Sequence, residues 1–445
     1  MNHNILMVSY YYPPYGGSGT FRSLGFSRNL VRFGWKLSVL TASEYLPELR
    51  DNSLLSRLPE GIRIINAPVH DPFLLWSKFK LKIRKKNNDY KNKHKGIPKI
   101  VKQSQVKPFV NFIDQMTRIF KTPDDSIGWF FPAVKATSKI SLKPDVIYSS
   151  APPFTSHLVG LLLKSRWKVP LVTDFRDPWI DNPFRVYPGK AVDWWDRFLE
   201  KLVFKKSDLI IANTSKMAEL FKYKYPYYIN KICMINNGFD YEDFVYILPQ
   251  RDEPKDCILL IHPGTLYGKR NPLKFLHALK RIIGEGYENL RIKFIGKCEQ
   301  FENKDISEHV VDMGLEQHVK ISPPVSRDEI LSLMKGADGL LLFSQGTTLQ
   351  VPAKLFEYLA LDKPVIAIGE KNSATEDIVG QLSGNHFWAE NAVDDIACIL
   401  KDFCSIAGIS KDIALQESNC NFERGFLTKQ LSDHMEKIIV NQFNR

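Results

Sequence analysis

A glycine-rich segment, Pro13–Gly19, lies between an expected strand over residues 5–9 and an expected helix over 20–33. Glycines allow backbone N–H groups to approach an anionic ligand at a helix N-terminus. The spacing matches neither the dinucleotide-binding fingerprint nor the P-loop, so the segment by itself fits a tight turn equally well. Arg22 lies one turn into the helix and could face the same cleft.

The segment TDFRDPW, residues 173–179, places two carboxylates and a guanidinium directly after an expected strand. Because Pro178 disfavours a continuous strand, we expect Asp174, Arg176 and Asp177 to be displayed on a loop. One interpretation is an internal Asp–Arg pair that pins the loop. The other is one face of an acceptor site, with an acid/base or hydroxyl-orienting role.

Basic residues also precede a helix in the segment 263–272, PGTLYGKRNP. Lys269 and Arg270 lie just before the helix, and Pro272 suits its first turn. Cations beside a helix N-terminus indicate a shared anion such as a diphosphate. Two solvated basic side chains are the alternative.

The segment 351–360, VPAKLFEYLA, opens another helix after a strand and a loop. Glu357 lies within the first two turns, three residues after Lys354. Its carboxylate could accept hydrogen bonds from a ribose diol while the helix N-terminus holds phosphates. An i, i+3 Lys–Glu surface pair is the alternative.

The elements that position these segments are buried strands alternating with helices, a pattern typical of parallel sheets covered on both faces. The alternation occurs twice, which predicts an α/β protein with two doubly wound domains. We place the first domain at 1–240 and the second at 255–415, joined by a linker over 241–255. A C-terminal helix within 416–445 is expected to pack back on the first domain. Ligands of such sheets bind at the carboxyl ends of the strands, where the four segments lie.

The composition is that of a globular protein, with 44% apolar and 25% charged residues among 445. This excludes a mainly disordered or collagen-like chain. The net charge of +12 is concentrated in residues 78–107, which hold twelve Lys/Arg and one acid. Few aromatic residues accompany them, so we expect no nucleic-acid partner. We interpret the stretch from about 70 to 125 as an insertion that docks on an anionic membrane surface; a solvated loop is the alternative.

Several site classes are absent from the sequence. It contains no DxD, HExxH, GxSxG or GK[ST] string, which argues against a carboxylate-held metal site, a zinc protease, an α/β-hydrolase and a P-loop enzyme. The six cysteines form no CxxC pair and are expected to be reduced thiols of a cytoplasmic protein. We find no signal peptide and no membrane-spanning segment.

With these motifs in this order, the chain resembles bacterial glycosyltransferases of family 4 (group 1), in a branch with PAK/PSK-type helices and a DFRDPW motif. The resemblance covers nearly the whole chain except roughly 70–125. It implies the GT-B fold, two Rossmann-like domains facing a central cleft. It also implies retaining transfer from a nucleotide sugar, usually a UDP-sugar, without a metal or other cofactor.

The resemblance implies that the C-terminal domain binds the nucleotide and the N-terminal domain the acceptor. Arg270 and Lys354 would stabilise the leaving diphosphate, and Asp174 and Arg176 are further catalytic candidates. The nucleotide-sugar site would consist of Gly16, Gly17, Gly264, Thr265, Lys269, Arg270, Ala353, Lys354, Leu355 and Glu357. The acceptor site would consist of Arg22, Asp174, Arg176 and Asp177.

Two positions depart from the family pattern. Many members carry two glutamates separated by seven residues, and Leu349 replaces the first of them. The loop Ser344–Gln350 must then contact the sugar through backbone groups, Thr347, Thr348 or Gln350. Thr265 stands where many members have arginine.

The sequence therefore predicts a retaining hexosyltransferase-type enzyme of surface polysaccharide biosynthesis, with a lipid-linked or glycan acceptor. It is expected at the inner face of the plasma membrane as a peripheral protein. A GT-B sugar epimerase is one alternative. A catalytically inactive GT-B scaffold that binds a partner or a membrane is another.

Overall fold

The computed structural model describes residues 3–43, 50–70, 121–183, 185, 189–407 and 417–443. Its contacts divide the chain into two compact units. The N-terminal unit comprises residues 1–211 and 434–445, and the C-terminal unit comprises residues 212–433. The basic segment 78–107 lies outside the described residues, so its membrane-docking role stays a prediction.

The first sheet has seven strands in the order β3-β2-β1-β4-β5-β6-β7. The pairs of β1 with β2 and β4, of β2 with β3, and of β4 with β5 are parallel. The strands are β1 (Asn4–Ser9), β2 (Lys36–Ser43), β3 (Arg63–Pro68), β4 (Val146–Ala151), β5 (Leu171–Phe175), β6 (Leu209–Ala212) and β7 (Ile232–Met234).

The helices between these strands begin and end at residues that suit the termini. α1 (Ser18–Arg32) starts after Gly17, whose φ of 105° favours glycine. It ends at Arg32; Gly34, just beyond the helix, has a φ of 87°, and the Trp35 N–H donates to the Leu30 carbonyl at 3.0 Å. The other α-helices are α4 (Phe130–Ala136), α5 (Thr155–Trp167), α6 (Lys190–Lys206) and α7 (Ser215–Lys224). The 3-10 helices are η2 (Asn52–Arg57), η3 (Asp125–Trp129), η4 (Thr137–Lys139), η5 (Pro226–Lys231) and η6 (Tyr241–Asp243).

The second sheet has six strands in the order β10-β9-β8-β11-β12-β13, each paired in parallel with its neighbours. The strands are β8 (Ile258–Pro263), β9 (Leu290–Ile295), β10 (Val319–Ser322), β11 (Gly339–Phe343), β12 (Val365–Gly369) and β13 (Phe387–Glu390). The α-helices that follow β8 in the sequence are α8 (Leu273–Gly284), α9 (Ile306–Asp312), α10 (Arg327–Gly336), α11 (Lys354–Ala360), α12 (Ala374–Val379), α13 (Val393–Ala407), α14 (Glu417–Cys420) and α15 (Arg424–Phe443). The unit boundary between residues 433 and 434 falls within α15.

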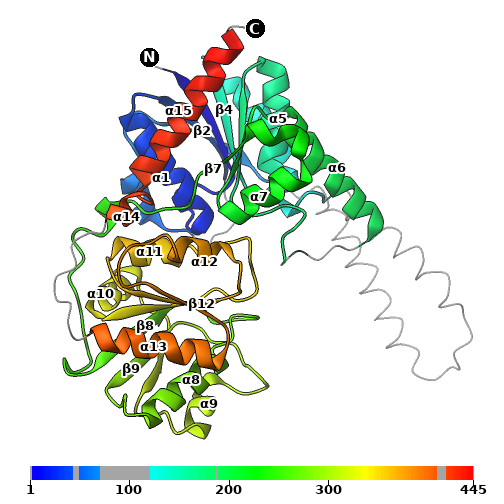
Figure 1. Cartoon of the computed structure of the whole chain (residues 1–445). Coiled ribbons are helices and arrows are strands. Elements are labelled where there is room, and N and C mark those ends of the chain that lie inside the picture. The colour runs from blue at the N-terminus through cyan, green and yellow to red at the C-terminus, as the bar shows by residue number, and fades with distance from the viewer. Residues whose placement is uncertain are drawn as a thin grey trace, which may run out of the picture. The chain divides into compact units, whose positions relative to one another are not determined.

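Successive residues of one strand pack on opposite faces of the second sheet. Leu341 and Phe343 of β11 join the core that includes α8 and α13. Leu340 and Leu342 join the core that includes α10 and α11. Because both faces are covered, the strand is hydrophobic without interruption. Figure 1 shows helices on both faces of each sheet, which confirms the prediction of two doubly wound α/β domains.

Two further properties concern the described residues. None of their helices combines the length and apolar character that a membrane span requires. All six cysteines are free.

Candidate functional site

The centre of the second sheet is its topological switch point. The chain leaves β8 toward β9 on one side and leaves β11 toward β12 on the other, and open α/β sheets bind ligands at such a point. A pocket of about 420 Å³ lies at the carboxyl ends of β8 and β9. It is lined by Pro263, Gly264, Thr265, Ile295, Gly296, Lys297, Pro324, Val325, Ile330, Met334, Lys354 and Glu357.

Gly264 and Lys354 meet in this pocket. Gly264 has a φ of 101°, and a β-carbon at this position would fall on the Lys354 side-chain ammonium. Glycine is therefore required for two reasons, the backbone conformation and the close approach of the lysine. Burial, and next the nearby Arg270, lower the pKa of Lys354 to about 8.

Two cations of this site, Lys354 and Arg270, form no ion pair within the part of the chain that the structure describes. The Glu357 carboxylate, which lines the same pocket, acts on Lys354 only through its charge, and the Arg270 guanidinium stacks over the Tyr267 ring, 5.2 Å from its centroid. Lys269 is exposed, and its side chain packs on Gly346, where a β-carbon would lie 2.7 Å from the lysine β-carbon. Two neighbouring cations that are held without an ion pair favour the binding of an anion.

Glu357 is held by a residue of another helix. Its Oε1 accepts a hydrogen bond from Arg327 Nη1 at 3.0 Å, and the two side chains form a part-buried ion pair. The carboxylate therefore pairs with the first residue of α10 and not with Lys354, its neighbour in the sequence. Its second oxygen remains available to a ligand in the pocket.

Three other residues predicted for the nucleotide-sugar site lie at the start of α11 or at the rim of the pocket. Leu355 is fully buried in the core, and its N–H donates to the Pro352 carbonyl at 3.0 Å. Its side chain thus does not face the pocket. Ala353 is exposed at the start of the helix, and Thr265 is exposed at the pocket rim.

In the N-terminal unit, Arg22 and Asp174 form a buried ion pair. Nε and Nη2 of Arg22 each donate to one oxygen of Asp174 at 2.8 Å. Tyr148 donates its hydroxyl to the same carboxylate, and Arg22 and Asp174 are 1% and 0% exposed. The expectation that Asp174 is displayed on a loop is wrong, because β5 continues through Phe175 and bends only afterwards. Arg22 and Asp174 are thus assigned to an internal pair and not to an acceptor surface.

The remaining predicted residues of this unit lie near the start of α1. A β-carbon at Gly19 would fall on the Arg176 guanidinium, which donates to the Pro152 carbonyl. Gly17 is exposed, with open space around it, and Asp177 is half-buried. Gly16, Gly17, Arg176 and Asp177 therefore remain the predicted ligand-binding residues of the N-terminal unit.

Solved structures show the same fold at low sequence identity. Sucrose-phosphate synthase from Thermosynechococcus elongatus is 12% identical, with a TM-score of 0.58 over 99% of this chain and 100% of that one. A glycosyltransferase from Rickettsia africae ESF-5 is 14% identical, with a TM-score of 0.59 over 98% and 99%. HepE of Anabaena, in complex with UDP-glucose, is 15% identical, with a TM-score of 0.55 over 98% and 100%. No curated protein sequence matches the chain.

Two family models match consecutive parts of the sequence. The model described as Glycosyltransferase Family 4 matches residues 102–243, and the model described as Glycosyl transferases group 1 matches residues 247–407. Together they span about two thirds of the chain. The chain is a group 1 glycosyltransferase of the GT-B type. Its assignment to the PAK/PSK-type branch stays a prediction.

Three residues that the sequence analysis did not name as site residues contact residues of the candidate site or of the loops beside it. Arg327 pairs with Glu357, and Glu370 accepts from the Gly346 N–H at 3.1 Å. Gln345, 3% exposed, donates through Nε2 to the Asn271 carbonyl at 3.4 Å. All three contacts join residues at least 24 positions apart. Of the three residues, only Gln345 could have been found from the sequence, because it lies within the loop Ser344–Gln350 that follows β11.

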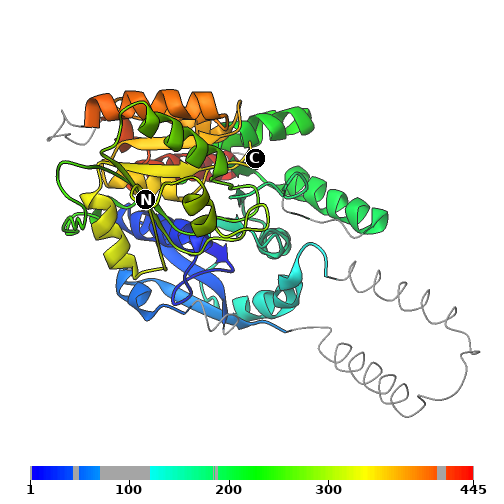
Figure 2. The ribbon, with the colours of Figure 1, turned by 90° about the horizontal axis from the view of Figure 1, so that it is seen from below.

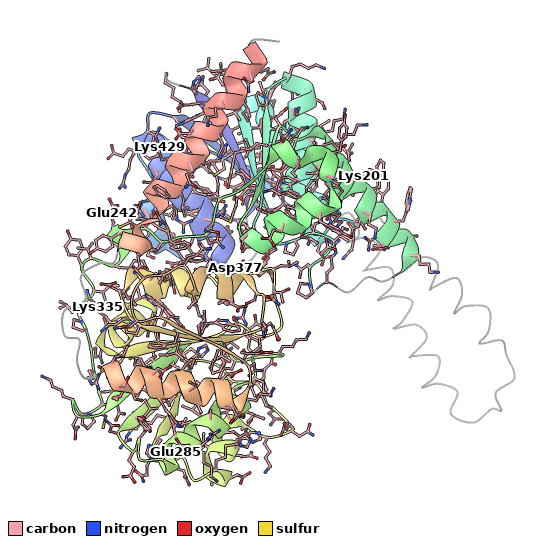
Figure 3. The ribbon with its side chains drawn as sticks, viewed as in Figure 1. Lys201, Glu242, Glu285, Lys335, Asp377 and Lys429 are labelled. Atoms are coloured by element: carbon pink, nitrogen blue, oxygen red, sulfur yellow. The ribbon has the colours of Figure 1, made fainter. Side chains whose placement is uncertain are left out.

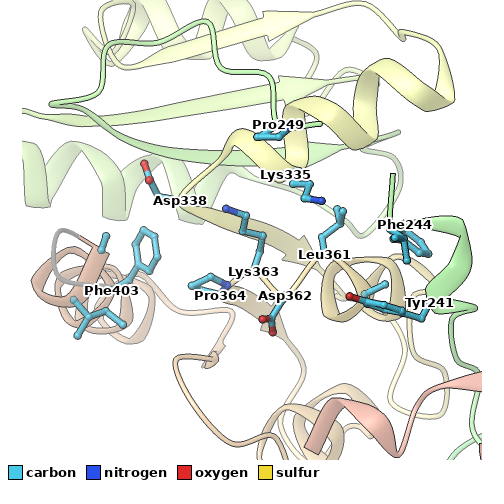
Figure 4. Close-up of a pocket in the computed structure, with 14 residues that line it drawn as sticks. Tyr241, Phe244, Pro249, Lys335, Asp338, Leu361, Asp362, Lys363, Pro364 and Phe403 are labelled. Carbon is cyan, nitrogen blue, oxygen red and sulfur yellow. The ribbon is translucent and has the colours of Figure 1, made fainter. Parts of the chain in front are cut away.

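A second pocket of the glycosyltransferase has the same volume, about 420 Å³, but lies at the amino ends of β11 and β12 (Figure 4). Asp338 and Pro364, which precede these strands, line it together with Lys335, Lys363 and Tyr241. Volume therefore does not identify the donor site. The carboxyl-end pocket is the candidate, because it lies at the switch point and contains Lys354, whose pKa the nearby Arg270 lowers.

The lowered pKa of Lys354 predicts a pH dependence of UDP binding. With a pKa of about 8 in the free enzyme, the lysine is mostly charged at pH 7 and mostly neutral at pH 9. A bound diphosphate favours the charged form, so binding takes up protons and weakens above pH 8, by up to about tenfold per pH unit. Isothermal titration with UDP at pH 7 to 9.5 measures this. The same slope in Lys354→Arg, which stays charged, would contradict the assignment.

Proposed function

We propose that this glycosyltransferase moves a sugar from a UDP-sugar to a lipid-linked or glycan acceptor of a surface polysaccharide, with retention of the anomeric configuration. The observation that carries the proposal is the pair Lys354 and Arg270, two cations that form no ion pair with a described residue, at and beside the switch-point pocket. A nucleoside diphosphate supplies the missing negative charge. HepE of Anabaena, which has the same fold, binds UDP-glucose, and this supports the choice of donor.

The proposed roles follow from the geometry. Lys354 and Arg270 stabilise the charge that develops on the departing diphosphate, the kind of preorganised electrostatic contribution that is typically the largest in catalysis. Glu357, fixed by Arg327, accepts hydrogen bonds from the ribose hydroxyls. The leaving phosphate takes the proton of the acceptor hydroxyl, so no nucleophilic side chain is required. Leu349 leaves the recognition of the transferred sugar to the loop Ser344–Gln350.

A UDP-release screen over a panel of nucleotide sugars, with a membrane extract as acceptor, tests the proposal. We expect UDP release that depends on the acceptor for one donor. Conversion of the donor sugar to its epimer would assign the chain to the epimerases instead. A thermal-shift measurement distinguishes the inactive scaffold, since a chain that does not bind UDP gains no stability from it.

We propose that transfer proceeds without a metal ion. The two cations provide positive charge at the position where a metal would otherwise neutralise the diphosphate, and the sequence contains no DxD string. EDTA is therefore expected to leave the rate of transfer unchanged. Loss of activity on chelation, with recovery on addition of Mn²⁺ or Mg²⁺, would contradict this.

We further propose that the enzyme acts at the inner face of the plasma membrane. The basic segment 78–107 supports this through its charge, since each Lys or Arg near an anionic surface contributes about 1 kcal/mol of attraction. The proposal accounts for access to a lipid-linked acceptor in a chain whose described helices include none suited to span a bilayer.

A further inference from the structure

Helix α6 exposes large aromatic side chains to solvent. Trp194 is 65% exposed and Phe198 is 45% exposed, although both belong to side-chain types that proteins usually bury. Their rings stack with centroids 6.1 Å apart, and the half-buried Trp195 stacks on Phe198 at 5.3 Å. The three rings form one continuous apolar patch, which we call the α6 aromatic patch.

The same helix has a separate buried face. Val192, Leu199 and Val203 lie in the interior, and the two acidic residues Asp196 and Glu200 are fully buried with them. Asp196 accepts from Trp179 Nε1 at 3.2 Å, and Glu200 accepts from the Ile180 N–H at 2.9 Å. Two of the three negative charges of α6 are thus directed inward, away from the aromatic patch.

Basic residues flank the aromatic patch on the exposed side. Lys190, four residues before Trp194, is exposed, and so are Arg197, Lys201 and Lys205, which follow Trp194 at helical spacing. Asp193 is the one acidic residue of α6 outside its buried face, and Arg197 binds it at 2.9 Å. Lys201 is exposed on α6 (Figure 3), and α6 runs along the outside of that unit in two perpendicular views (Figures 1 and 2).

We propose that α6 is a membrane-docking helix, which places Trp194, Phe198 and Trp195 in the headgroup region of an anionic bilayer while its lysines bind the lipid phosphates. An aromatic stripe beside a basic stripe on one helix face is the pattern of helices that lie in the membrane interface. Tryptophan in particular has an apolar ring and an N–H donor, and it is enriched at that depth.

Charge complementarity selects lipid over a protein partner. The exposed side of α6 presents cations with one paired carboxylate, so a second copy of the same surface would repel it. An anionic bilayer attracts that surface, and the aromatic side chains then add a hydrophobic contribution that salt does not screen. The proposal rests on the proposed function in one respect: docking would bring the enzyme to a lipid-linked acceptor.

Flotation of the full-length protein with vesicles tests the proposal without any sugar substrate. Vesicles of phosphatidylcholine with phosphatidylglycerol are compared with phosphatidylcholine alone, at low and physiological salt. We expect binding to the anionic vesicles, and a loss of about tenfold or more in affinity for the double variant Trp194→Gln, Phe198→Gln. Lys190→Gln, Lys201→Gln is expected to weaken binding at low salt and to reduce its salt dependence.

Matched controls remove exposed side chains of the same types elsewhere. Tyr246→Gln removes a 90% exposed aromatic ring, and Lys280→Gln removes an exposed lysine of α8; neither is expected to change vesicle binding. A variant with Lys82, Arg84, Lys85 and Lys86 changed to Gln measures the separate contribution of segment 78–107. Equal binding of the α6 double variant and the wild type overturns the proposal.

Two other outcomes also decide the matter. If the α6 double variant changes the oligomeric state but not vesicle binding, the patch is an interface between copies of the chain and the proposal is wrong. If vesicle binding depends on α6 but no donor yields UDP release, docking stands and the proposed transferase function fails. Each result therefore has one interpretation.

Discussion

Lys354→Ala and Arg270→Ala are each expected to lower the rate of sugar transfer by on the order of 10²-fold or more, the effect of removing one preorganised charge-stabilising group. Both side chains are cations beside the switch-point pocket, and Lys354 is held against Gly264. Because the diphosphate gains charge as the sugar leaves, the loss should appear mainly in kcat. Steady-state kinetics with the donor found in the UDP-release screen measures it.

Controls separate this effect from misfolding. Lys280→Ala removes an exposed lysine of the same domain and is expected to keep full activity. Gly264→Ala should reproduce the loss seen in Lys354→Ala, because its β-carbon takes the place of the lysine ammonium. Turnover of Lys354→Ala and Arg270→Ala within threefold of the wild type, with unchanged thermal melting, would remove both residues from the site.

Asp174→Ala is expected to destabilise the protein by about 3–5 kcal/mol, the effect of leaving one buried charge without its partner. Arg22 is 1% exposed and donates twice to this carboxylate, so the variant leaves a guanidinium in the core. Denaturant unfolding, followed by a probe in the N-terminal unit, measures the loss. The double variant Arg22→Met, Asp174→Leu removes both charges and should recover much of the stability.

This experiment also tests the acceptor role that the sequence suggested for Asp174. If Asp174→Asn retains the melting temperature of the wild type but loses transfer, the carboxylate acts on substrate and the structural assignment is wrong. If the double apolar variant is stable and active, the pair serves the fold alone.

The sequence predicts the second domain well because its elements are long and regularly separated. Its strands β8, β9 and β11 are predominantly apolar runs separated by helices, the alternation from which the sequence predicts this domain. Short elements at the sheet edges were missed, among them β7 and β13, because three or four residues carry too little periodicity to be recognised. The loop expected over 173–179 is wrong for its first three residues, which belong to β5. Pro178 indicates that the strand ends before it, but not at which residue.

A site residue can be predicted from the sequence where a local motif both contains the residue and shows where in the fold it lies. Lys354 and Gly264 each stand next to a strand-to-helix connection, so the sequence places both at the carboxyl edge of the sheet. The contact between them depends on tertiary structure, because the two residues are 90 positions apart in the sequence. The pairing of Arg327 with Glu357 and of Arg22 with Asp174 likewise depends on the packing of separate elements, for which one sequence has no local signal.

The strand order of the first sheet has a consequence for how the protein is made. β1 pairs with β2 on one side and with β4 on the other, so that Ile5 faces Val146. A ribosome adds about 5–20 residues per second, and the first strand therefore waits on the order of ten seconds for its second neighbour. During that time the β1–α1–β2 segment exposes an apolar edge, and Asp174, which binds Arg22 in the folded protein, has not yet been synthesised. Heterologous production should thus benefit from slow translation or abundant chaperone chiefly while the first 180 residues emerge.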